Sequence, residues 1–333
     1  MAEKIYQTYS QLLDKLRNRG LEIENTDDAM QILQKENYYN VINGYKQWFL
    51  CTPASNSIEE QYKSGTTFQE LYALYRFDRE VRHIYLKYLL QIENSLKSVI
   101  SHEFSSQYGH DNYLRLSHFQ TASSEHSSAE KNTASVIKLI GDIQQEIARQ
   151  MNKHHDVVTH YMTEHGYIPL WVLVNVLTFG KITNFYSNMK PSDQICVAKN
   201  FGVPAKELHK YMVMLGLARN KCAHDERFFN IRFRQSLHTK SIKNFRKLAL
   251  TPTDSGSYIS GTNDAYAIAI IFAQLLPQKD LVDFIQAMQI AFSNLSQNLH
   301  ALSLNDIQKI MGYPFDWKRI SLLKSKPPVE PVV

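Results

Sequence analysis

The amino-acid sequence predicts an all-α protein built as a helical bundle, and three observations support this fold class. The 333 residues include only 12 Gly and 10 Pro, which is below average usage and leaves room for long helices. Apolar residues recur at spacings of three and four along successive segments, as they do on the buried stripe of an amphipathic helix. No pair of alternating apolar and polar segments is joined by a tight turn, so β-hairpins are not indicated.

The N-terminal region is expected to hold two short helices. The first covers residues 4–18 and ends at Arg19-Gly20, where a glycine is a suitable C-cap. The second begins near Asn25 or Thr26, both of which are good N-cap residues. Two further segments complete this region, a tyrosine-rich run over residues 38–45 and a loop over residues 51–65.

A long helical pattern runs from Phe68 to about Tyr108. Thr66 or Thr67 precedes it as a candidate N-cap. About 40 residues would be long for one helix of a globular protein, so we expect a bend or a break within it. One face of this helix is charged, and we expect it to pair with carboxylates or to brace a neighbouring helix through Arg76, Asp78, Arg79 and Arg82.

A polar loop over residues 117–135 and a helix over about 135–160 are expected next. Near the end of that helix lie four histidines, of which only His155 and His160 approach a common helical face. No carboxylate takes the position it has in a zinc-protease motif, so a solvated helix end is favoured over a metal site. Three helices should follow, over Trp171–Leu177 (ending at Phe179-Gly180), Ile182–Met189 and Asp193–Phe201.

The most informative segment is a predicted helix over residues 205–227, which we call the motif helix. Wound at about 100° per residue, it has an apolar face formed by Tyr211, Met214, Leu215, Ala218 and Cys222. Val213 and Leu217 fall on the other side, so the separation is imperfect. The opposite face carries an amide, an imidazole and a guanidinium at positions i, i+4 and i+7, with a second guanidinium beside them: Asn220, His224, Arg227 and Arg219.

Positive charge gathers on the end of the motif helix and just after it. Residues 219–247 contain nine Lys or Arg against Asp225 and Glu226, a local balance of +7. Since the whole chain carries +5, the remainder sums to −2. Such a concentration is typical of a surface that binds phosphate groups, although a solvated basic surface has the same composition.

Several classes of protein are disfavoured. The three cysteines are far apart and form no CxxC pair, so neither a disulfide framework nor a zinc ribbon is indicated. The first residues do not form a signal peptide, and the longest apolar run, Ala265–Leu276, is shorter than the ~20 residues of a membrane span. We therefore expect a cytoplasmic protein without a membrane partner. The C-terminal part should contain a loop over 251–262, helices over 264–276, 279–299 and 304–311, and a disordered tail over 326–333.

An Arg followed by a His with four to six residues between them is a known ribonuclease motif, but the spacing alone carries little information. Chance supplies several such pairs in this chain: Arg76/His83, Arg149/His154, Arg149/His155, Arg219/His224 and Arg232/His238. Context favours Arg219/His224, because only this Arg is followed directly by Asn, ends an amphipathic helix and begins the basic stretch.

The amino-acid sequence also resembles a family, the AbiD/AbiF-type abortive-infection proteins of bacteria, which belong to the HEPN superfamily. The matching segments occur in the family's order. The sequence departs from the family in the run between Tyr39 and Gly44, and in Asp225-Glu226-Arg227, where a second His is common. The segments are Arg19–Ile23, Tyr38-Tyr39 with Gly44-Tyr45, Leu71–Arg82, Ile92-Glu93, Pro169–Trp171 with Leu177–Ile182, Ala218–His224, and Gly312–Pro314 with Trp317.

This resemblance implies a HEPN-like core over residues 66–235, including the inserted loop 117–135, with helical extensions over 1–60 and 236–325. It also implies cleavage of RNA without a metal or another cofactor, and halted growth during infection. In that chemistry Arg219 would hold the scissile phosphate, Asn220 would orient it or the imidazole, and His224 would act as the base. Because such sites combine two HEPN units, one motif would require a homodimer. The candidate RNA-binding residues are Lys221, Arg227, Arg232, Arg234, Lys243 and Arg246.

Other interpretations remain open. The protein would be an RNA-binding module if its nuclease site were idle or silenced by a small antitoxin RNA, with Phe228, Phe229, Phe233 and Phe245 available for base stacking. A third possibility is a helical scaffold that binds another protein. Individual residues also have plainer roles. Asn220 could hydrogen-bond a neighbouring helix, Arg227 could pair with Asp225 or Glu226, His224 could be a half-buried structural residue, and the charged face of helix 68–108 could contact RNA directly.

Overall fold

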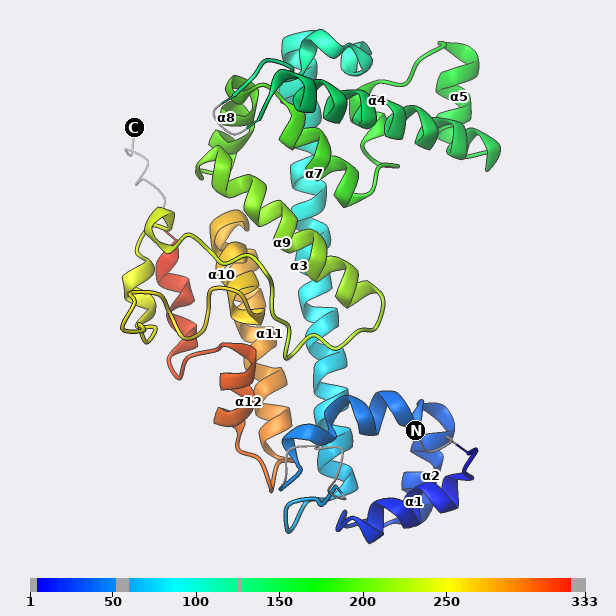
Figure 1. Cartoon of the computed structure of the whole chain (residues 1–333), viewed down its shortest axis with the longest axis vertical. Coiled ribbons are helices and arrows are strands. Elements are labelled where there is room, and N and C mark those ends of the chain that lie inside the picture. The colour runs from blue at the N-terminus through cyan, green and yellow to red at the C-terminus, as the bar shows by residue number, and fades with distance from the viewer. Residues whose placement is uncertain (1–4, 52–59, 125–126, 325–333) are drawn as a thin grey trace, which may run out of the picture.

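The computed structural model describes residues 5–51, 60–124 and 127–324, and every regular element within them is a helix (Figure 1). This confirms the all-α prediction. The molecule is elongated, and helix α3 (Phe68–Tyr108) forms a column that runs through it from one end to the other. Many of the other helices pack along successive parts of this column, and the rest pack against those helices or against one another.

Helix α3 is continuous over 41 residues, so the predicted break within it is wrong. The Thr67 side chain caps its start by accepting a hydrogen bond from the Glu70 N–H, at 3.0 Å. Gly109, at φ +88°, ends it in a conformation that favours glycine. No Gly or Pro occurs between these caps, and helices from both halves of the chain cover its length. Tertiary packing therefore stabilises a helix that would be unusually long on its own.

Two short helices lie at one end of the molecule as predicted, although the first begins at Tyr9, because Thr8 caps it and residues 5–8 are not helical. Helix α1 (Tyr9–Asn18) is followed by Gly20 at φ +84°, and α2 (Thr26–Lys35) is capped by the Asn25 side chain. A π-helical turn, η1 (Tyr39–Asn43), then packs against α3, and a 3-10 turn, η2 (Lys46–Trp48), follows. Residues 52–59 of the predicted loop lie outside the described residues.

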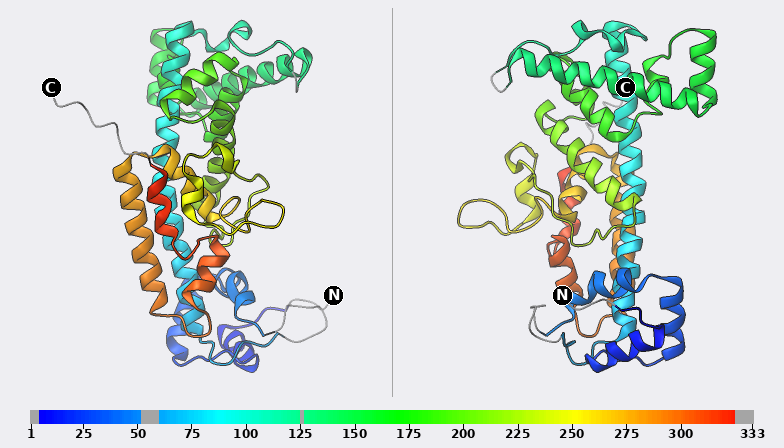
Figure 2. Two further views of the ribbon diagram at one scale, coloured as in Figure 1. Left: turned by 90° about the vertical axis from the view of Figure 1, so that its left-hand side faces the viewer. Right: turned by 45° about the vertical axis from the view of Figure 1, so that its right-hand side comes forward.

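The other end of α3 carries the middle third of the chain (Figures 1 and 2). The helix predicted over 135–160 is two helices, because His154 at φ +53° interrupts it. Phe179-Gly180 begins a helix instead of ending one, since the Thr178 side chain caps the Lys181 N–H. The predicted polar loop is also shorter, because a helix starts at Ala129. The elements are α4 (Ala129–Asn152), α5 (Asp156–Glu164), α6 (Leu170–Leu173), α7 (Phe179–Asn188) and α8 (Pro191–Asn200).

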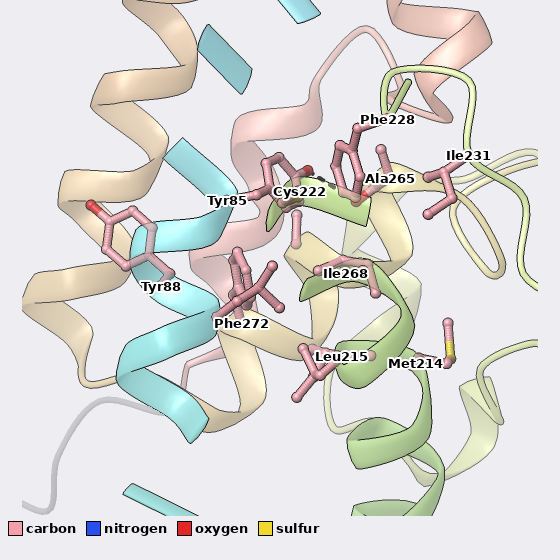
Figure 3. Close-up of a cluster of buried hydrophobic side chains, with 14 of the residues drawn as sticks. Tyr85, Tyr88, Met214, Leu215, Cys222, Phe228, Ile231, Ala265, Ile268 and Phe272 are labelled. Atoms are coloured by element: carbon pink, nitrogen blue, oxygen red, sulfur yellow. Dashed lines mark hydrogen bonds between the residues drawn. The ribbon is translucent and has the colours of Figure 1, made fainter. Parts of the chain in front are cut away.

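The C-terminal helices form the core beside α3. Helix α11 (Gln278–Ser296) packs along α3, and α10 (Ala265–Leu275) is buried along almost its whole length. Figure 3 shows Tyr85 of α3 meeting Phe272 of α10 in this core, where the Tyr85 hydroxyl donates a hydrogen bond to the Ala265 carbonyl. Helix α12 (Leu304–Met311) and the 3-10 turns η5 (Thr239–Ser241), η6 (Phe245–Leu248) and η7 (Trp317–Leu323) complete the fold.

Two further predictions concern membrane-spanning helices and the C-terminal tail. Within the described ranges, no helix combines the length and the apolar composition that crossing a membrane requires. The disordered tail predicted over 326–333 lies outside the described residues.

Helices α4 and α7 are joined by Glu146, whose side chain is 4% exposed. Its carboxylate accepts hydrogen bonds from Lys181 of α7 and from Gln150, both at 2.7 Å, and from Arg149. Burial alone raises the pKa of Glu146, but the hydrogen bonds from Arg149, Lys181 and Gln150 outweigh it and lower the pKa to about 2. The stabilisation is therefore present above the ordinary pKa of 4.5 and is lost as the pH falls toward 2.

We predict that Glu146→Gln lowers the free energy of unfolding by about 2 kcal/mol at pH 7. The deficit relative to the wild type should shrink below pH 4.5 and be largely lost near pH 2, where the wild-type Glu146 carboxyl becomes protonated and, like the glutamine amide, uncharged. Urea unfolding at a series of pH values measures this difference. The exposed Glu130→Gln on the same helix is the control. A deficit that stays constant down to pH 2 would contradict the assignment.

Candidate active site

Helix α9 (Ala205–Ala223) corresponds to the motif helix and packs against α3, α7, α8 and α10. Its apolar face is buried as predicted, whereas Asn220 is exposed on the opposite side. Burial raises the pKa of the Cys222 thiol to about 12, so this cysteine is a core residue and no nucleophile at neutral pH. The buried residues are Tyr211, Met214, Leu215, Ala218 and Cys222, of which Met214, Leu215 and Cys222 appear in Figure 3.

The helix ends at Ala223, four residues earlier than predicted, and His224 is its C-cap. Asp225 follows at φ +57°, a left-handed conformation that Asp tolerates better than most residues. Arg227 consequently does not continue the stripe of Asn220 and His224 along the helix. Its guanidinium donates a hydrogen bond to the Gly44 carbonyl, so the predicted pairing with Asp225 or Glu226 is also wrong.

A buried ion pair on α3 determines this early end. Asp78 is fully buried and accepts hydrogen bonds from Arg82 at 2.9 Å and from the Tyr45 hydroxyl at 2.7 Å. It also accepts from the backbone N–H groups of Phe228 and Phe229, with a shortest distance of 2.7 Å. The second end of the Arg82 guanidinium pairs with Asp225. We call this set the Asp78 clamp; the prediction that the charged face of α3 braces its neighbour is confirmed for Asp78 and Arg82.

Two adjacent phenylalanines anchor the segment that the clamp holds. Phe228 packs against Tyr85 in the core, and Phe229 stacks on Tyr45 with their ring centroids 5.6 Å apart (Figure 3 shows Phe228). Both side chains have no exposed surface, and Phe233 and Phe245 are 5% exposed. The expectation that these four rings are available for base stacking is therefore wrong, since they form the core that underlies the basic stretch.

Arg219 lies on the side of α9 that faces α3. Its Nε is 3.4 Å from a carboxylate oxygen of Glu93, whose other oxygen is 2.9 Å from Lys97. The Arg219 side chain is one-third exposed, and Glu93 is buried. The sequence analysis gave Glu93 no role, because a Glu–Lys pair at i, i+4 has the same spacing as the ion pairs of exposed helix surfaces.

The side chain of His224 lines a hollow of about 600 Å³, which we call the His224 hollow. The side chain is exposed and makes no hydrogen bond to any described residue, so the prediction of a half-buried structural histidine is wrong. The end of α9, residues 225–232 and η1 form the walls. Three predicted cations lie here with His224: Lys221, Arg227 and Arg232.

The other predicted site residues are distributed over neighbouring surfaces. Asn220 and Arg234 line a second hollow of about 560 Å³, which shares Lys221 and Arg232 with the first. Arg246 lines a third hollow beside η6, and Lys243 lines none of these three. Arg219 lines neither of the two hollows at the end of α9. One subunit thus brings His224 together with three of the six predicted RNA-binding cations.

We predict that Asp78→Asn lowers the free energy of unfolding by about 3–5 kcal/mol, because it leaves the buried Arg82 with the exposed Asp225 as its remaining charged partner. Amide hydrogen exchange at Phe228 and Phe229 should accelerate as well, since an amide cannot accept at both oxygen positions. Urea unfolding and exchange measured by mass spectrometry report the two effects. The exposed Asp254→Asn is the control. A stability equal to that of the control would contradict the role given to the clamp.

The matched family model covers most of the chain that builds this site and ends just before Ile231 and Arg232. The model described as Abi-like protein matches residues 31–230, which include η1, α3, α9 and the segment held by the Asp78 clamp. Comparison with curated proteins and with solved structures gave no match. The chain belongs to the Abi-like protein family, whose name points to abortive infection, the defence of bacteria against phages.

Proposed function

We propose that this protein is an endoribonuclease of abortive infection, which cuts RNA without a metal at His224 and thereby halts growth. The observation that carries the proposal is the position of His224, an exposed imidazole without a partner among the described residues, beside three cations in one hollow. Histidine titrates near neutral pH, so an accessible imidazole is suited to exchange protons with a substrate.

The charge of the hollow supports a phosphate-bearing substrate. Lys221 pairs with Glu226 at 2.7 Å, and Asp225 pairs with Arg82, which also pairs with the buried Asp78. Arg227 and Arg232, in contrast, donate to uncharged backbone carbonyls, those of Gly44, Ile231 and Ile310. The three cations of the lining thus outnumber its two carboxylates, Asp225 and Glu226, and this net positive charge favours an anion beside His224.

The reaction follows from the chemistry of RNA. His224 takes the proton of a 2′-hydroxyl, whose oxygen then forms a bond to the adjacent phosphorus. The bond between phosphorus and the 5′-oxygen breaks, that oxygen takes a proton from water, and His224 returns the proton it accepted to the solvent. The products are a 2′,3′-cyclic phosphate and a 5′-hydroxyl end, and no cofactor is consumed. Guanidinium groups near the phosphate would stabilise the charge that builds on its oxygens.

Arg219 and Asn220 enter this proposal through a second copy of the chain. Arg219 does not share the hollow of its own His224, and the HEPN-like arrangement implied by the sequence combines two motif helices. The surface of α9 beside Asn220 carries Leu217, which is 53% exposed, and Val213. An apolar patch next to an incomplete polar site favours a homodimer in which Arg219 and Asn220 approach the partner's His224.

A second candidate function is the binding of a small antitoxin RNA that silences the site. The supporting observation is a separate basic hollow beside η6, lined by Lys240, Arg246 and Lys247. The two functions are compatible, since a bound RNA would restrain a working nuclease.

We predict that His224→Ala reduces RNA cleavage by at least about 100-fold and relieves growth arrest, because the proton acceptor is removed. Cleavage by purified protein in EDTA and growth after induced expression measure the two effects. His155→Ala is the control, because Arg149/His155 repeats the ribonuclease spacing at an exposed helix start. Equal cleavage by the wild type and the His224 variant would refute the proposal, whereas RNA that copurifies uncut would favour the second candidate.

We further predict that Arg219→Ala and His224→Ala are each inactive but recover about a quarter of the wild-type activity when mixed as equal amounts of dissociated chains. Half of the re-formed dimers are then mixed, and in each of these one of two sites keeps both residues. Cleavage assays before and after mixing measure the recovery. Leu217→Glu, introduced into both variants, should prevent it by disrupting the apolar patch. Mixtures that stay inactive would contradict sharing of the site between subunits.

A further inference from the structure

One aromatic residue of the His224 hollow has no role in packing. Tyr39 of η1 is 68% exposed and lines the hollow, and its ring contacts no other aromatic ring of the described residues. The neighbouring Tyr45 and Tyr75 are buried and hydrogen-bonded. An exposed ring beside a candidate reaction centre is available for a ligand.

The structure holds Tyr39 rigidly relative to His224. Val41 and Ile42 of the same π-helical turn are completely buried, and the Gly44 carbonyl accepts a hydrogen bond from Arg227. Tyr45, just after the turn, donates to Asp78, which also holds the segment after His224. Both walls of the hollow are therefore fixed by one clamp. π-helical turns are rare and occur frequently at functional sites.

Three carboxamides lie in the same hollow. Asn40 and Asn43 come from η1, and Asn230 comes from the segment after α9. None of the three side chains is hydrogen-bonded to another described residue. A carboxamide both donates and accepts hydrogen bonds, as the edges of nucleobases do.

The hollow thus offers partners for each part of a nucleotide. Tyr39 provides a ring for stacking, the carboxamides provide groups for the base edge, and the guanidinium groups of Arg227 and Arg232 provide positive charge for a phosphate. Its volume of about 600 Å³ falls within the range of small-molecule sites, which is roughly 300–1,000 Å³.

We propose that the His224 hollow binds one unstacked nucleotide of single-stranded RNA, with its base on Tyr39 and its edge against Asn40 and Asn43. This proposal rests on the proposed function for its consequence, namely that the bound base selects which phosphodiester bond is cleaved beside His224. Tyr39 is then a binding residue that determines specificity, and the base-binding wall comes from the N-terminal region instead of from the motif helix.

Binding is tested with the four 3′-mononucleotides and the matching nucleosides, titrated into the wild type and followed by NMR. Tyr39→Ala should weaken nucleotide binding by at least about fivefold, and Tyr39→Phe should preserve it. Arg232→Ala should weaken the binding of the nucleotides, which carry a phosphate, but not the binding of the nucleosides. The exposed Tyr167→Ala, outside the hollow, is the control. Equal affinities of the wild type and Tyr39→Ala would overturn the proposal.

Cleavage of a random RNA pool separates this proposal from the proposed function. Both the nuclease and the nucleotide site are supported if the wild type cuts with a base preference. This preference should be weaker in Asn40→Ala or Asn43→Ala and unchanged in Tyr167→Ala. If the wild type cuts and these variants cut at the same positions, the nucleotide site is refuted and the nuclease stands. If nothing is cut while Tyr39-dependent binding is measured, the nuclease is refuted and the nucleotide site stands.

Discussion

The buried pair of Asp78 and Arg82 is the interaction on which the site depends. Asp78 receives four donors from three parts of the chain, including the backbone of Phe228 and Phe229, and Arg82 reaches Asp225 just beyond α9. A buried carboxylate without these partners would be strongly unfavourable, so the segment after α9 must stay where it satisfies the charge. The place where α9 ends, and hence where His224 stands, follows from this requirement.

The same constraint explains how distant segments form one surface. Residues near position 40, residues of α3 and residues near position 225 meet because each contacts the clamp or the rings around it. The phenylalanine side chains of the basic stretch are buried, whereas its Lys and Arg side chains are not. A sequence that looks like interleaved aromatic and basic residues is therefore two layers, an apolar one that fixes the backbone and a charged one that faces solvent.

The sequence was sufficient where local chemistry decides the structure. Thr67, Asn25 and Gly20 act as the caps they were predicted to be, and the apolar face of α9 follows from its periodicity. It was insufficient where a distant partner decides. The end of α9 depends on Arg82, about 140 residues earlier, and the continuity of α3 depends on helices from both halves of the chain. The exposed Tyr39 could not be distinguished from its buried neighbours by pattern alone.

The division into a HEPN-like core with extensions, the homodimer and the RNA partner stay predictions, and one measurement tests their common premise most directly. An RNA whose cut site has been mapped is synthesised again with a single 2′-deoxynucleotide on the 5′ side of that site. Attack by the 2′-hydroxyl predicts that cutting in EDTA stops at this position alone, and that the unmodified RNA yields a 2′,3′-cyclic phosphate. Undiminished cutting at the deoxynucleotide would contradict the role assigned to His224.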